Sequence, residues 1–512
     1  MSLSVVYSRA GIGVSAPLVT IEVHVSNGLP GLSIVGLPEA SVKESKDRVR
    51  GAILNSNFEF PAKRIIINLA PADLPKEGGR FDLPIAIGIL LASGQIYGDK
   101  TPKAHNVEAY ELLGELALSG KLREINGALP VALQARKAGR KLILPAGNAN
   151  EVSFVCEEGI IAADSLLAVC LHLGGQQVLP FFRSNHAQPV TDVCPDMVDV
   201  KGQYQAKRAM EIAAAGGHSV LMVGSPGTGK TMLASRLPGI LPEMNETEAA
   251  EAAAIQSVSK QGFDYNNWRK RAFRAPHHTA SAVALVGGGS NPKPGEISLA
   301  HNGVLFLDEL PEFGRHVLEV LREPLESGKI VISRAARQAE YPANFQLVAA
   351  MNPCPCGYHG DKAGRCHCTQ EQVSRYKNKI SGPLMDRIDM HIEVPRLENL
   401  NQLSDKDAAI ESSRQIKARV QVARNIQTQR NGVCNAKMQV SDIEKYCQLD
   451  GASQHFLNQS IEKLKLSNRA YHRILKLART IADIEARENI GIAHIAEAIN
   501  YRRLDRVVAQ QV

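Results

Sequence analysis

The sequence has no long hydrophobic run, no recognisable leader and few cysteines. Its longest apolar stretch, Leu83 to Ala92, is far too short to span a bilayer. The N-terminal residues lack a basic segment followed by an apolar core and a small-residue cleavage site, so we expect no signal peptide. Nine cysteines among 512 residues, without a secretory signal, argue against a disulfide framework. These absences predict a cytoplasmic protein with no membrane partner.

The composition is that of a folded protein of several domains. A chain of 512 residues exceeds one ordinary core, so we expect about two to four domains. Hydrophobic residues make up 44% and charged residues 22%, which is typical of globular proteins. The formal net charge of +7 suits a polyanionic partner, but it equally suits an ordinary bacterial enzyme.

The order of expected elements divides the chain into four segments. Residues 1–180 alternate between strand-like and helix-like patterns, and residues 181–200 form a polar linker. Residues 201–396 alternate again, which predicts a parallel sheet covered by helices. Residues 397–512 are almost purely helical. The strands expected in the first and third segments are Val19–Val25, Ile65–Asn68, Lys141–Leu144, Ser219–Val223, Val304–Leu307 and Phe345–Ala350.

A phosphate-binding motif opens the third segment. It matches G-x-x-x-x-G-K-[ST] at every fixed position and lies between an apolar strand and a helix-forming run. Its glycines let backbone N–H groups surround phosphate oxygens, the lysine reaches the β- and γ-phosphates, and the threonine ligates Mg²⁺. The alternative is a glycine-rich turn with a chance lysine. The motif residues are Gly224, Ser225, Pro226, Gly227, Thr228, Gly229, Lys230 and Thr231.

Two carboxylates follow an apolar strand about eighty residues later. Asp308 and Glu309 come directly after Val304–Leu307, and a buried parallel strand places such acids at the edge where phosphates lie. We predict that Asp308 holds Mg²⁺ and that Glu309 polarises the attacking water, a role that hydrolysis needs and simple nucleotide binding does not. Alone, the run would also fit a solvated strand end.

These motifs, with the intervening segments 273–279 (FRAPHHT) and 287–292 (GGGSNP), resemble one family along essentially the whole chain. It is the magnesium-chelatase-like AAA+ ATPases of the YifB/ComM type. The resemblance implies a P-loop AAA+ core, a C-terminal helical lid and a ring of copies, expected to be a hexamer, with ATP bound between subunits. His277 and His278 also suggest a metal site, but adjacent side chains seldom ligate one ion together.

The resemblance assigns further residues of the ATP site. Asn352 is similar to the sensor-1 residue that positions the lytic water, and Arg387 to the arginine finger that reaches a neighbour's nucleotide. Arg469 is similar to the sensor-2 arginine, with Arg473 one turn away as its rival. For each arginine the alternative is a solvated surface residue.

Two segments resemble the pore elements of the related MCM motors. Gly328–Phe345 is similar to a pre-sensor hairpin carrying Arg334 and Arg337, and Gly287–Ser298, with Lys293, to a helix-2 insertion. In a ring these cations would contact DNA phosphates without reading sequence. The alternative is an ordinary surface hairpin with scattered charge.

Four cysteines cluster within fifteen residues as two C-x-C pairs: Cys354, Cys356, Cys366 and Cys368. Zinc binds four soft ligands in a tetrahedron, so we predict a structural zinc site. The spacing is tighter than usual, which leaves His359 or His367 as an alternative fourth ligand. Four reduced cysteines or a redox pair remain the other interpretations.

The N-terminal segment resembles a Lon-type serine protease that has lost its dyad. The similarity lies in residues 75–79 and 114–121, and it implies a Lon-protease-like (ribosomal S5 domain 2-like) α/β domain. Arg80 occupies the position of the nucleophilic serine and Leu129 that of the lysine, so this dyad cannot hydrolyse peptides. We expect a non-catalytic domain that binds DNA, shapes the ring or docks partners.

Three functions follow from these observations. The resemblance implies an ATP-dependent DNA motor that drives branch migration of homologous DNA during natural transformation. The alternative is a magnesium-chelatase-like motor subunit that remodels a protein partner without DNA. A Lon-like peptidase is nearly excluded by the missing dyad. The cofactors expected are ATP, Mg²⁺ and structural Zn²⁺.

Overall fold

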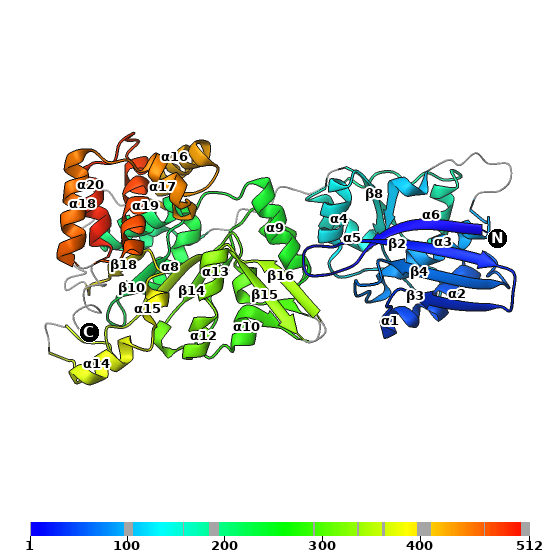
Figure 1. Ribbon diagram of the computed structural model, residues 1–512, viewed down its shortest axis with the longest axis horizontal. Helices are drawn as coiled ribbons and strands as arrows, with labels where there is room; N and C mark the ends of the chain where they lie inside the picture. Colours follow the sequence, from blue (N-terminus) through cyan, green and yellow to red (C-terminus); the bar gives the residue numbers. More distant parts are fainter. Residues whose placement is uncertain are drawn as a thin grey trace. The chain divides into compact units, whose positions relative to one another are not determined.

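The computed structural model describes residues 2–96, 106–156, 158–183, 194–289, 292–334, 337–360, 364–396, 411–464 and 466–502 (Figure 1). The chain divides into two compact units, which are described separately. Unit 1 comprises Met1–Val190, Ala250–Trp268 and Ala335–Tyr341, and unit 2 comprises Thr191–Ala249, Arg269–Arg334 and Pro342–Val512. Part of the expected linker (184–193) and the beginning of the expected lid (397–410) lie outside the described residues.

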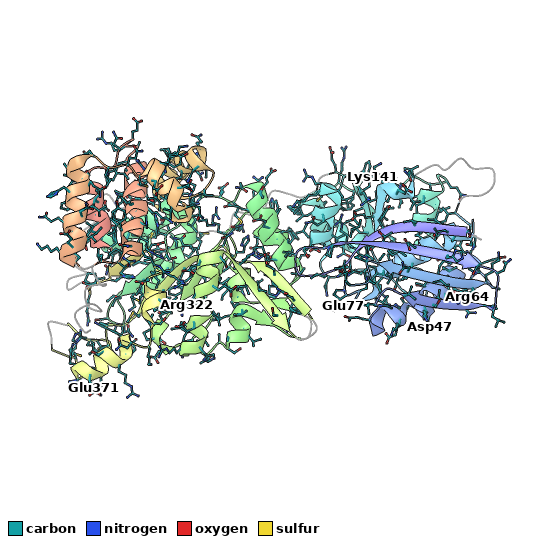
Figure 2. The ribbon with its side chains drawn as sticks, viewed as in Figure 1. Asp47, Arg64, Glu77, Lys141, Arg322 and Glu371 are labelled. Carbon is teal, nitrogen blue, oxygen red and sulfur yellow. The ribbon has the colours of Figure 1, made fainter. Side chains whose placement is uncertain are left out.

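Unit 1 contains a mixed seven-stranded sheet in the order β3-β4-β2-β1-β5-β8-β9. Strands β4, β2 and β1 are antiparallel neighbours, whereas β3 pairs parallel to β4 and the series β1-β5-β8-β9 is parallel. The strands are β1 (Ser2–Arg9), β2 (Leu18–Ser26), β3 (Gly31–Val35), β4 (Arg64–Ala70), β5 (Tyr110–Leu112), β8 (Lys141–Pro145) and β9 (Ile160–Ala163). Figure 2 labels Arg64 and Lys141, the first residues of β4 and β8. The expected strands in this unit are confirmed.

The apolar run of the sequence is a core helix of unit 1. Helix α3 (Asp82–Ala92) packs on β1 and β2, and nearly all of its residues are buried, which explains why its sequence is apolar all round. The other helices are α1 (Ala40–Lys43), α2 (Ser45–Asn55), α4 (Ala128–Lys137), α5 (Ala146–Ser153) and α6 (Leu166–Leu173). A short pair, β6 (Glu115–Leu116) and β7 (Leu122–Arg123), forms a separate two-stranded sheet.

Unit 2 is built on a five-stranded parallel sheet in the order β11-β14-β17-β10-β18. Its strands are β11 (Phe273–Arg274), β14 (Val304–Leu307), β17 (Gln346–Met351), β10 (Val220–Val223) and β18 (Met390–Glu393). Strand β17 is buried at every position, as is β14, which fits a parallel sheet covered on both faces. Because all strands run the same way, the loops that follow them leave the sheet at one edge.

Helices surround this sheet and then form the C-terminal region of unit 2. Helix α19 has a strongly apolar face and packs on α7, α16 and α20. The helices are α7 (Tyr204–Gly216), α8 (Lys230–Arg236), α10 (Ala282–Val286), α11 (Glu296–Leu299), α12 (Arg315–Glu319), α13 (Arg322–Ser327), α14 (Gln370–Lys377), α15 (Gly382–Met385), α16 (Ser413–Asn431), α17 (Val440–Tyr446), α18 (Gly451–Leu464), α19 (Asn468–Ile484) and α20 (Ile492–Asn500). Helix α9 spans Glu246–Ser257.

The predicted fold class is confirmed: α/β units with parallel strands flanked by helices precede a helical C-terminal region. Two further strand pairs are β12 (Gly287–Gly288) with β13 (Lys293–Pro294), and β15 (Lys329–Arg334) with β16 (Arg337–Pro342). Among the described helices, none combines the length and the hydrophobicity that a membrane span requires.

Candidate nucleotide site and metal cluster

The phosphate-binding motif forms the loop between β10 and α8, as the sequence predicts. Gly227 and Gly229 adopt φ angles of +77° and +92°, in the left-handed region that favours glycine. At Gly224 the requirement is space, because a Cβ atom there would lie 2.4 Å from the carbonyl oxygen of Val394. The loop conformation therefore depends on the glycines of the motif.

The Lys230 side chain is buried and connects the loop to the neighbouring strand. Its Nζ donates to the carbonyl oxygens of Gly224 (2.7 Å) and Ser225 (3.0 Å) and to Asn352 Oδ1 (3.2 Å). Burial lowers the pKa of Lys230, and the nearby carboxylates Asp308 and Glu309 oppose that shift. The structure thus brings Lys230 and Asn352 together, two residues that are 122 positions apart in the chain.

The expected magnesium ligands are hydrogen-bonded to each other. Thr231 Oγ1 donates to Asp308 Oδ2 at 2.7 Å, so the first turn of α8 and the end of β14 meet at the sheet edge. A hydroxyl and a carboxylate are the hard oxygen ligands that Mg²⁺ prefers, so this pair fits the ion. Glu309 follows with a φ angle of +51°, an uncommon conformation for a residue with a Cβ. Its backbone N–H donates to Asp308 Oδ1 at 2.9 Å.

Gln203 belongs to the site but was not among the sequence predictions. Its side chain is buried, and Nε2 donates to the carbonyl oxygens of Thr228 (3.4 Å) and Pro395 (2.7 Å). Gln203 adopts a φ angle of +53° immediately before α7, and no sequence pattern signals that conformation. It fixes the middle of the phosphate-binding loop to the segment after β18.

Arg387, the expected arginine finger, is engaged within its own protomer. Its Nη2 lies 2.5 Å from Glu326 Oε1, and its Nη1 donates to the Pro383 carbonyl oxygen at 2.8 Å. The Arg387 side chain is 9% exposed, whereas that of Glu326 is 54% exposed. The guanidinium therefore reaches another copy only if this ion pair opens.

The two sensor-2 candidates have different surroundings on α19. Arg469 is exposed in the first turn of the helix. Arg473 Nη1 lies 2.6 Å from Asp389 Oδ1. Burial by itself would raise the pKa of Asp389, but Arg473 and His218 outweigh it and lower that pKa below its ordinary value. Arg473 thus holds α19 against the beginning of β18, and the sensor role of Arg469 stays a prediction.

The four clustered cysteines converge. Their sulfur atoms all lie within 4.8 Å of one another, and Cys354 Sγ lies 3.3 Å from Cys356 Sγ and 3.8 Å from Cys366 Sγ. Cys368 completes the set, and neither His359 nor His367 belongs to it. Four free thiols at this spacing fit a tetrahedral Zn²⁺.

The cysteine loop also contacts the phosphate-binding loop. A Cβ atom on Gly357 would lie 2.6 Å from Pro226 Cδ and 3.8 Å from Asn352 Cγ. Gly357 has a φ angle of +84°, so both its conformation and its surroundings require glycine. A metal ion that orders this loop would therefore also support Pro226 and Asn352.

The proposed DNA-contacting residues lie on the two short strand pairs of the expected pore elements. Lys293 is partly exposed on β13, opposite Gly288 of β12. Arg334 ends β15 and Arg337 begins β16, so the expected hairpin is present, but its tip and both arginine side chains lie outside the described residues. Their contact with DNA stays a prediction.

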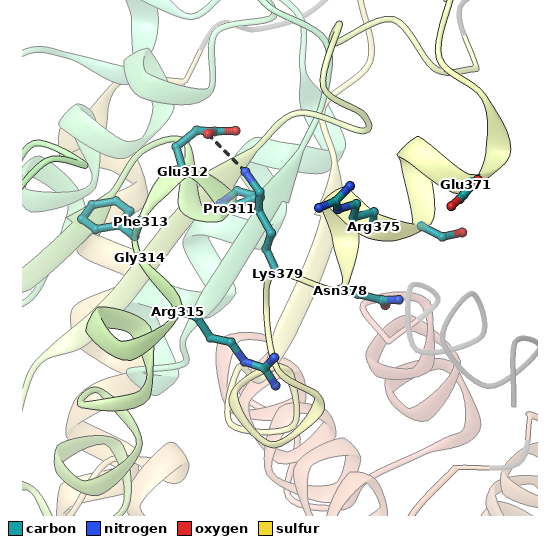
Figure 3. A pocket seen from close by; sticks show the side chains of 10 residues that line it. Pro311, Glu312, Phe313, Gly314, Arg315, Glu371, Arg375, Asn378 and Lys379 are labelled. Atoms are coloured by element: carbon teal, nitrogen blue, oxygen red, sulfur yellow. Dashed lines mark hydrogen bonds and ion pairs between the residues drawn. The ribbon is translucent and has the colours of Figure 1, made fainter.

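A pocket of 720 Å³ lies beyond the carboxylate strand, between the residues after Glu309 and one face of α14 (Figure 3). Arg315, Arg375 and Lys379 line it together with Glu312 and Glu371, so its charged lining is positive overall. Lys379 Nζ lies 3.3 Å from Glu312 Oε2. Figure 2 also labels Glu371, on α14.

In unit 1, the two positions that the Lon resemblance assigns to a protease dyad serve structural roles. Leu129 is fully buried on α4, in a cluster with Val155 and Ala253. Arg80 Nη2 donates to the Asn126 carbonyl oxygen at 3.0 Å, and burial lowers the pKa of Arg80 to about 10. The Lon-like character of this unit stays a prediction.

Comparison with known proteins identifies the family. Three descriptions match in succession: subunit ChlI of Mg-chelatase over residues 21–148, magnesium chelatase subunit ChlI over 196–402, and the ChlI C-terminal region over 410–502. Competence protein ComM of Haemophilus influenzae is 52% identical over 512 residues, which are 99% of this chain and 99% of that protein. The chain belongs to the YifB/ComM family of magnesium-chelatase-like proteins.

Other members and relatives of the YifB/ComM family agree with this assignment. The uncharacterized protein YifB of Escherichia coli is 51% identical over 99% of this chain and 98% of its own length. The magnesium-chelatase 38 kDa subunit of Cereibacter sphaeroides is 27% identical over 30% of this chain and 51% of its own length. The resemblance inferred from the motifs is confirmed. Membership of this family supports the prediction that the chain is an AAA+ ATPase that uses ATP and Mg²⁺. The cysteine cluster is compatible with structural zinc.

Proposed function

We propose that this YifB/ComM family member is an ATP-driven DNA motor that assembles as a hexameric ring and promotes branch migration during natural transformation. The observation that carries the proposal is the convergence of Lys230, Thr231 and Asp308 at one sheet edge, with Glu309 beside them. Such an arrangement suits the hydrolysis of a nucleoside triphosphate and not only its binding. The proposed role in natural transformation is supported by the relative named competence protein ComM.

Assembly into a ring gives Arg387 its role. A finger stabilises the charge on the phosphoryl group transferred in a neighbouring copy, so it must leave its own protomer. Its present partner, Glu326, is more than half exposed, so water can hydrate this carboxylate when the ion pair opens. The Arg387 side chain is only 9% exposed, so its exchange for a triphosphate also requires the arginine to leave its packed position. The sensor roles of Asn352 and Arg469 belong to the same proposal.

Binding of DNA would occur through phosphate contacts in the pore. Lys293, Arg334 and Arg337 lie on the two strand pairs proposed to face it. Such contacts give affinity that falls steeply with salt concentration and varies little with sequence. Zinc at the four cysteines would have a structural role.

A magnesium-chelatase-like motor that remodels a protein is the second candidate, favoured by the ChlI descriptions and the chelatase-subunit relative. The two candidates differ in one measurable property. ATP turnover by a DNA motor rises when duplex or branched DNA is added, whereas turnover by a chelatase-type motor is indifferent to DNA.

The decisive experiment is a three- or four-stranded junction assay with ATP and Mg²⁺. We expect branch movement by the unaltered protein and none by Lys230→Ala, because the phosphate-binding loop then lacks its buried cation. Lys463→Ala, which changes an exposed lysine on α18, is the matched control and should retain full activity. Equal activity of the Lys230 variant would contradict the mechanism, and ATP turnover without any DNA effect would favour the second candidate.

A further inference from the structure

A polar pocket in unit 1 is lined by residues to which neither the nucleotide-binding motifs nor the Lon resemblance assigns a role. Its volume is 240 Å³, and it lies between the turn that follows β7, the helix α5 and the end of α9 with the chain beyond it. All of these lining residues belong to unit 1. The lining consists of Glu124, Asn126, Asn148, Glu151 and Ser257, together with Ile125, Gly127, Gly262 and Phe263.

A buried asparagine holds two walls of this pocket together. Asn148 lies in the first turn of α5 and is buried. Its Oδ1 accepts from the Ile125 backbone N–H at 3.0 Å, and its Nδ2 donates to the Ile125 carbonyl oxygen at 2.9 Å. The turn that carries Glu124 is therefore fixed against α5. Glu151 follows Asn148 by three positions, so it lies on the same face of the helix.

Two carboxylates line the pocket from different segments. Glu151 is half-buried on α5, whereas Glu124 is exposed in the turn. Burial raises the pKa of Glu151, and the negative charge of Glu124 adds to the rise. The two carboxylates are thus close enough to repel each other, and the described residues that line the pocket include no basic side chain to neutralise them.

A buried hydroxyl group adds a further oxygen to the pocket. Ser257, the last residue of α9, is 3% exposed. Its Oγ has no hydrogen bond of ordinary geometry in the described part of the chain, although it lies near enough to Glu151 to favour the charged carboxylate. A buried polar group in this situation is costly unless a ligand satisfies it.

The helix that Glu124 contacts explains part of this arrangement. A Cβ atom on Gly147 would collide with the Glu124 carboxylate, so this group lies against the first turn of α5, where negative charge is favourable. This role accounts for Glu124 alone. It does not account for a second carboxylate at Glu151 or for the unsatisfied hydroxyl of Ser257.

The oxygen atoms of the pocket are those that a hard divalent cation binds. Two carboxylates balance a charge of +2, and hydroxyl and amide oxygens are suitable further ligands. A volume of 240 Å³ accommodates an ion with several water molecules, since each water occupies about 30 Å³. Mg²⁺ usually binds in this way, through one or two carboxylates while it keeps several waters.

We propose that this pocket binds a divalent cation of the Mg²⁺ class between Glu124, Glu151 and Ser257, at a site separate from the Mg²⁺ that accompanies ATP. The segment Ala250–Trp268 belongs to unit 1, although the residues on both sides of it in the chain belong to unit 2. An ion between α5 and the end of α9 fastens this segment to the rest of unit 1. Its role is therefore structural.

The first test counts bound Mn²⁺, a paramagnetic substitute for Mg²⁺, by electron paramagnetic resonance. The parent protein is full-length, nucleotide-free and zinc-loaded, and it carries Asp308→Asn so that the expected metal ligand of the ATP site is absent. We expect one Mn²⁺ per chain, displaced by Mg²⁺. Glu124→Gln combined with Glu151→Gln should weaken binding by about 100-fold or more, because even residues behind the metal ligands change affinity by about 10- to 100-fold. Glu108→Gln with Glu158→Gln, at two exposed glutamates of unit 1, is the matched control.

Thermal unfolding distinguishes an ion site from a structural role of the carboxylates alone. Without added Mg²⁺, the Glu124/Glu151 double variant should unfold at the Tm of the parent or higher, because the repulsion between the two carboxylates is gone. With Mg²⁺, the Tm of the parent should rise by several degrees and that of the double variant should not, because only the parent binds the ion. The order of the two proteins then reverses.

Three results would overturn the cation site. One is equal Mn²⁺ binding by the parent and the double variant, or none by the parent. Another is a Tm deficit of the double variant that is the same with and without Mg²⁺, which would leave the carboxylates a purely structural role. The third is an increase in Tm with spermidine but not with Mg²⁺, which would assign the pocket to an organic polyamine. None of these measurements requires ATP hydrolysis, so this site and the proposed motor are tested independently.

Discussion

Replacing Arg387 by alanine separates two roles that the structure gives to one side chain. Within the protomer, Arg387 is an ion-pair partner of Glu326 and a donor to the Pro383 carbonyl. In an assembled ring, we expect it to act on the nucleotide of the next copy. The first role concerns stability and the second concerns turnover, so the two losses differ greatly in size.

The expected loss of stability is small. Glu326 is 54% exposed, so its carboxylate becomes hydrated when Arg387 is removed, and an ion pair of this kind contributes about 0–1 kcal/mol. Loss of the buried aliphatic part of Arg387 adds on the order of 1 kcal/mol. For a unit of this size, each 1 kcal/mol lowers Tm by about 2–4 °C. The fall in Tm should therefore stay below about 8 °C.

The expected loss of turnover is much larger. Arginine fingers contribute about 10³- to 10⁵-fold to kcat, which corresponds to about 4–7 kcal/mol of barrier. Affinity for ATP should change little, because the contacts of Lys230 and Thr231 lie in the other half of the site. The assay is steady-state ATP hydrolysis, with nucleotide affinity measured separately by fluorescence.

A mixing experiment tests action between copies. Lys230→Ala lacks the phosphate-binding lysine but keeps Arg387. Arg387→Ala keeps the lysine but lacks the arginine finger. Mixed rings contain some sites in which an intact phosphate-binding loop faces an intact arginine finger. ATP hydrolysis by the mixture should therefore exceed that of either variant alone. Normal ATP turnover by Arg387→Ala would refute the arginine-finger role. A mixture that co-assembles without any gain in ATP turnover would do the same. In both cases Arg387 would be a structural residue paired with Glu326.

Two further predictions concern the cysteine cluster and a buried histidine. Purified protein should contain one zinc ion per chain by elemental analysis. The Cys366→Ser variant should lose the zinc and bind ATP several-fold more weakly, because the same loop places Gly357 against Pro226. Unchanged zinc content in this variant would contradict the zinc site. His218 is fully buried, and burial lowers its pKa despite the opposing effect of Asp389, so the unfolded chain takes up this proton first and stability should fall as pH drops below about 6.5. His218→Gln should flatten that part of the Tm-versus-pH curve, and an equally steep curve in the variant would show that other groups cause it.

The local elements could be predicted because their signals are local. Four apolar residues followed by two acids predicted both the strand Val304–Leu307 and the position of Asp308 at its end. The phosphate-binding loop followed from the spacing of its glycines, whose positive φ angles the structure confirms at Gly227 and Gly229. The cysteine spacing predicted the cluster but left a histidine as an alternative ligand, and the structure gathers four sulfurs.

The contacts between distant segments could not be predicted. No sequence pattern signals that Gln203 adopts a positive φ and reaches Thr228, because such a conformation depends on the surrounding packing. Nor does the sequence indicate that Arg387 is paired with Glu326, since Glu326 lies on α13 and Arg387 follows α15 about sixty positions later. The adjacent histidines suggest only a metal site, so nothing in the sequence indicates that His278 Nδ1 lies 3.3 Å from Glu309 Oε2.

By itself the sequence determined the chemistry that is available: a lysine and glycines for phosphate, a threonine and an aspartate for Mg²⁺, a glutamate for water and four thiols for zinc. Periodicity and spacing carry this information because each signal spans only a few residues. The tertiary structure decided which of these groups meet. Strand order in a parallel sheet is set by packing and long connections, and only that order places β11 beside β14 and so brings His278 to Glu309.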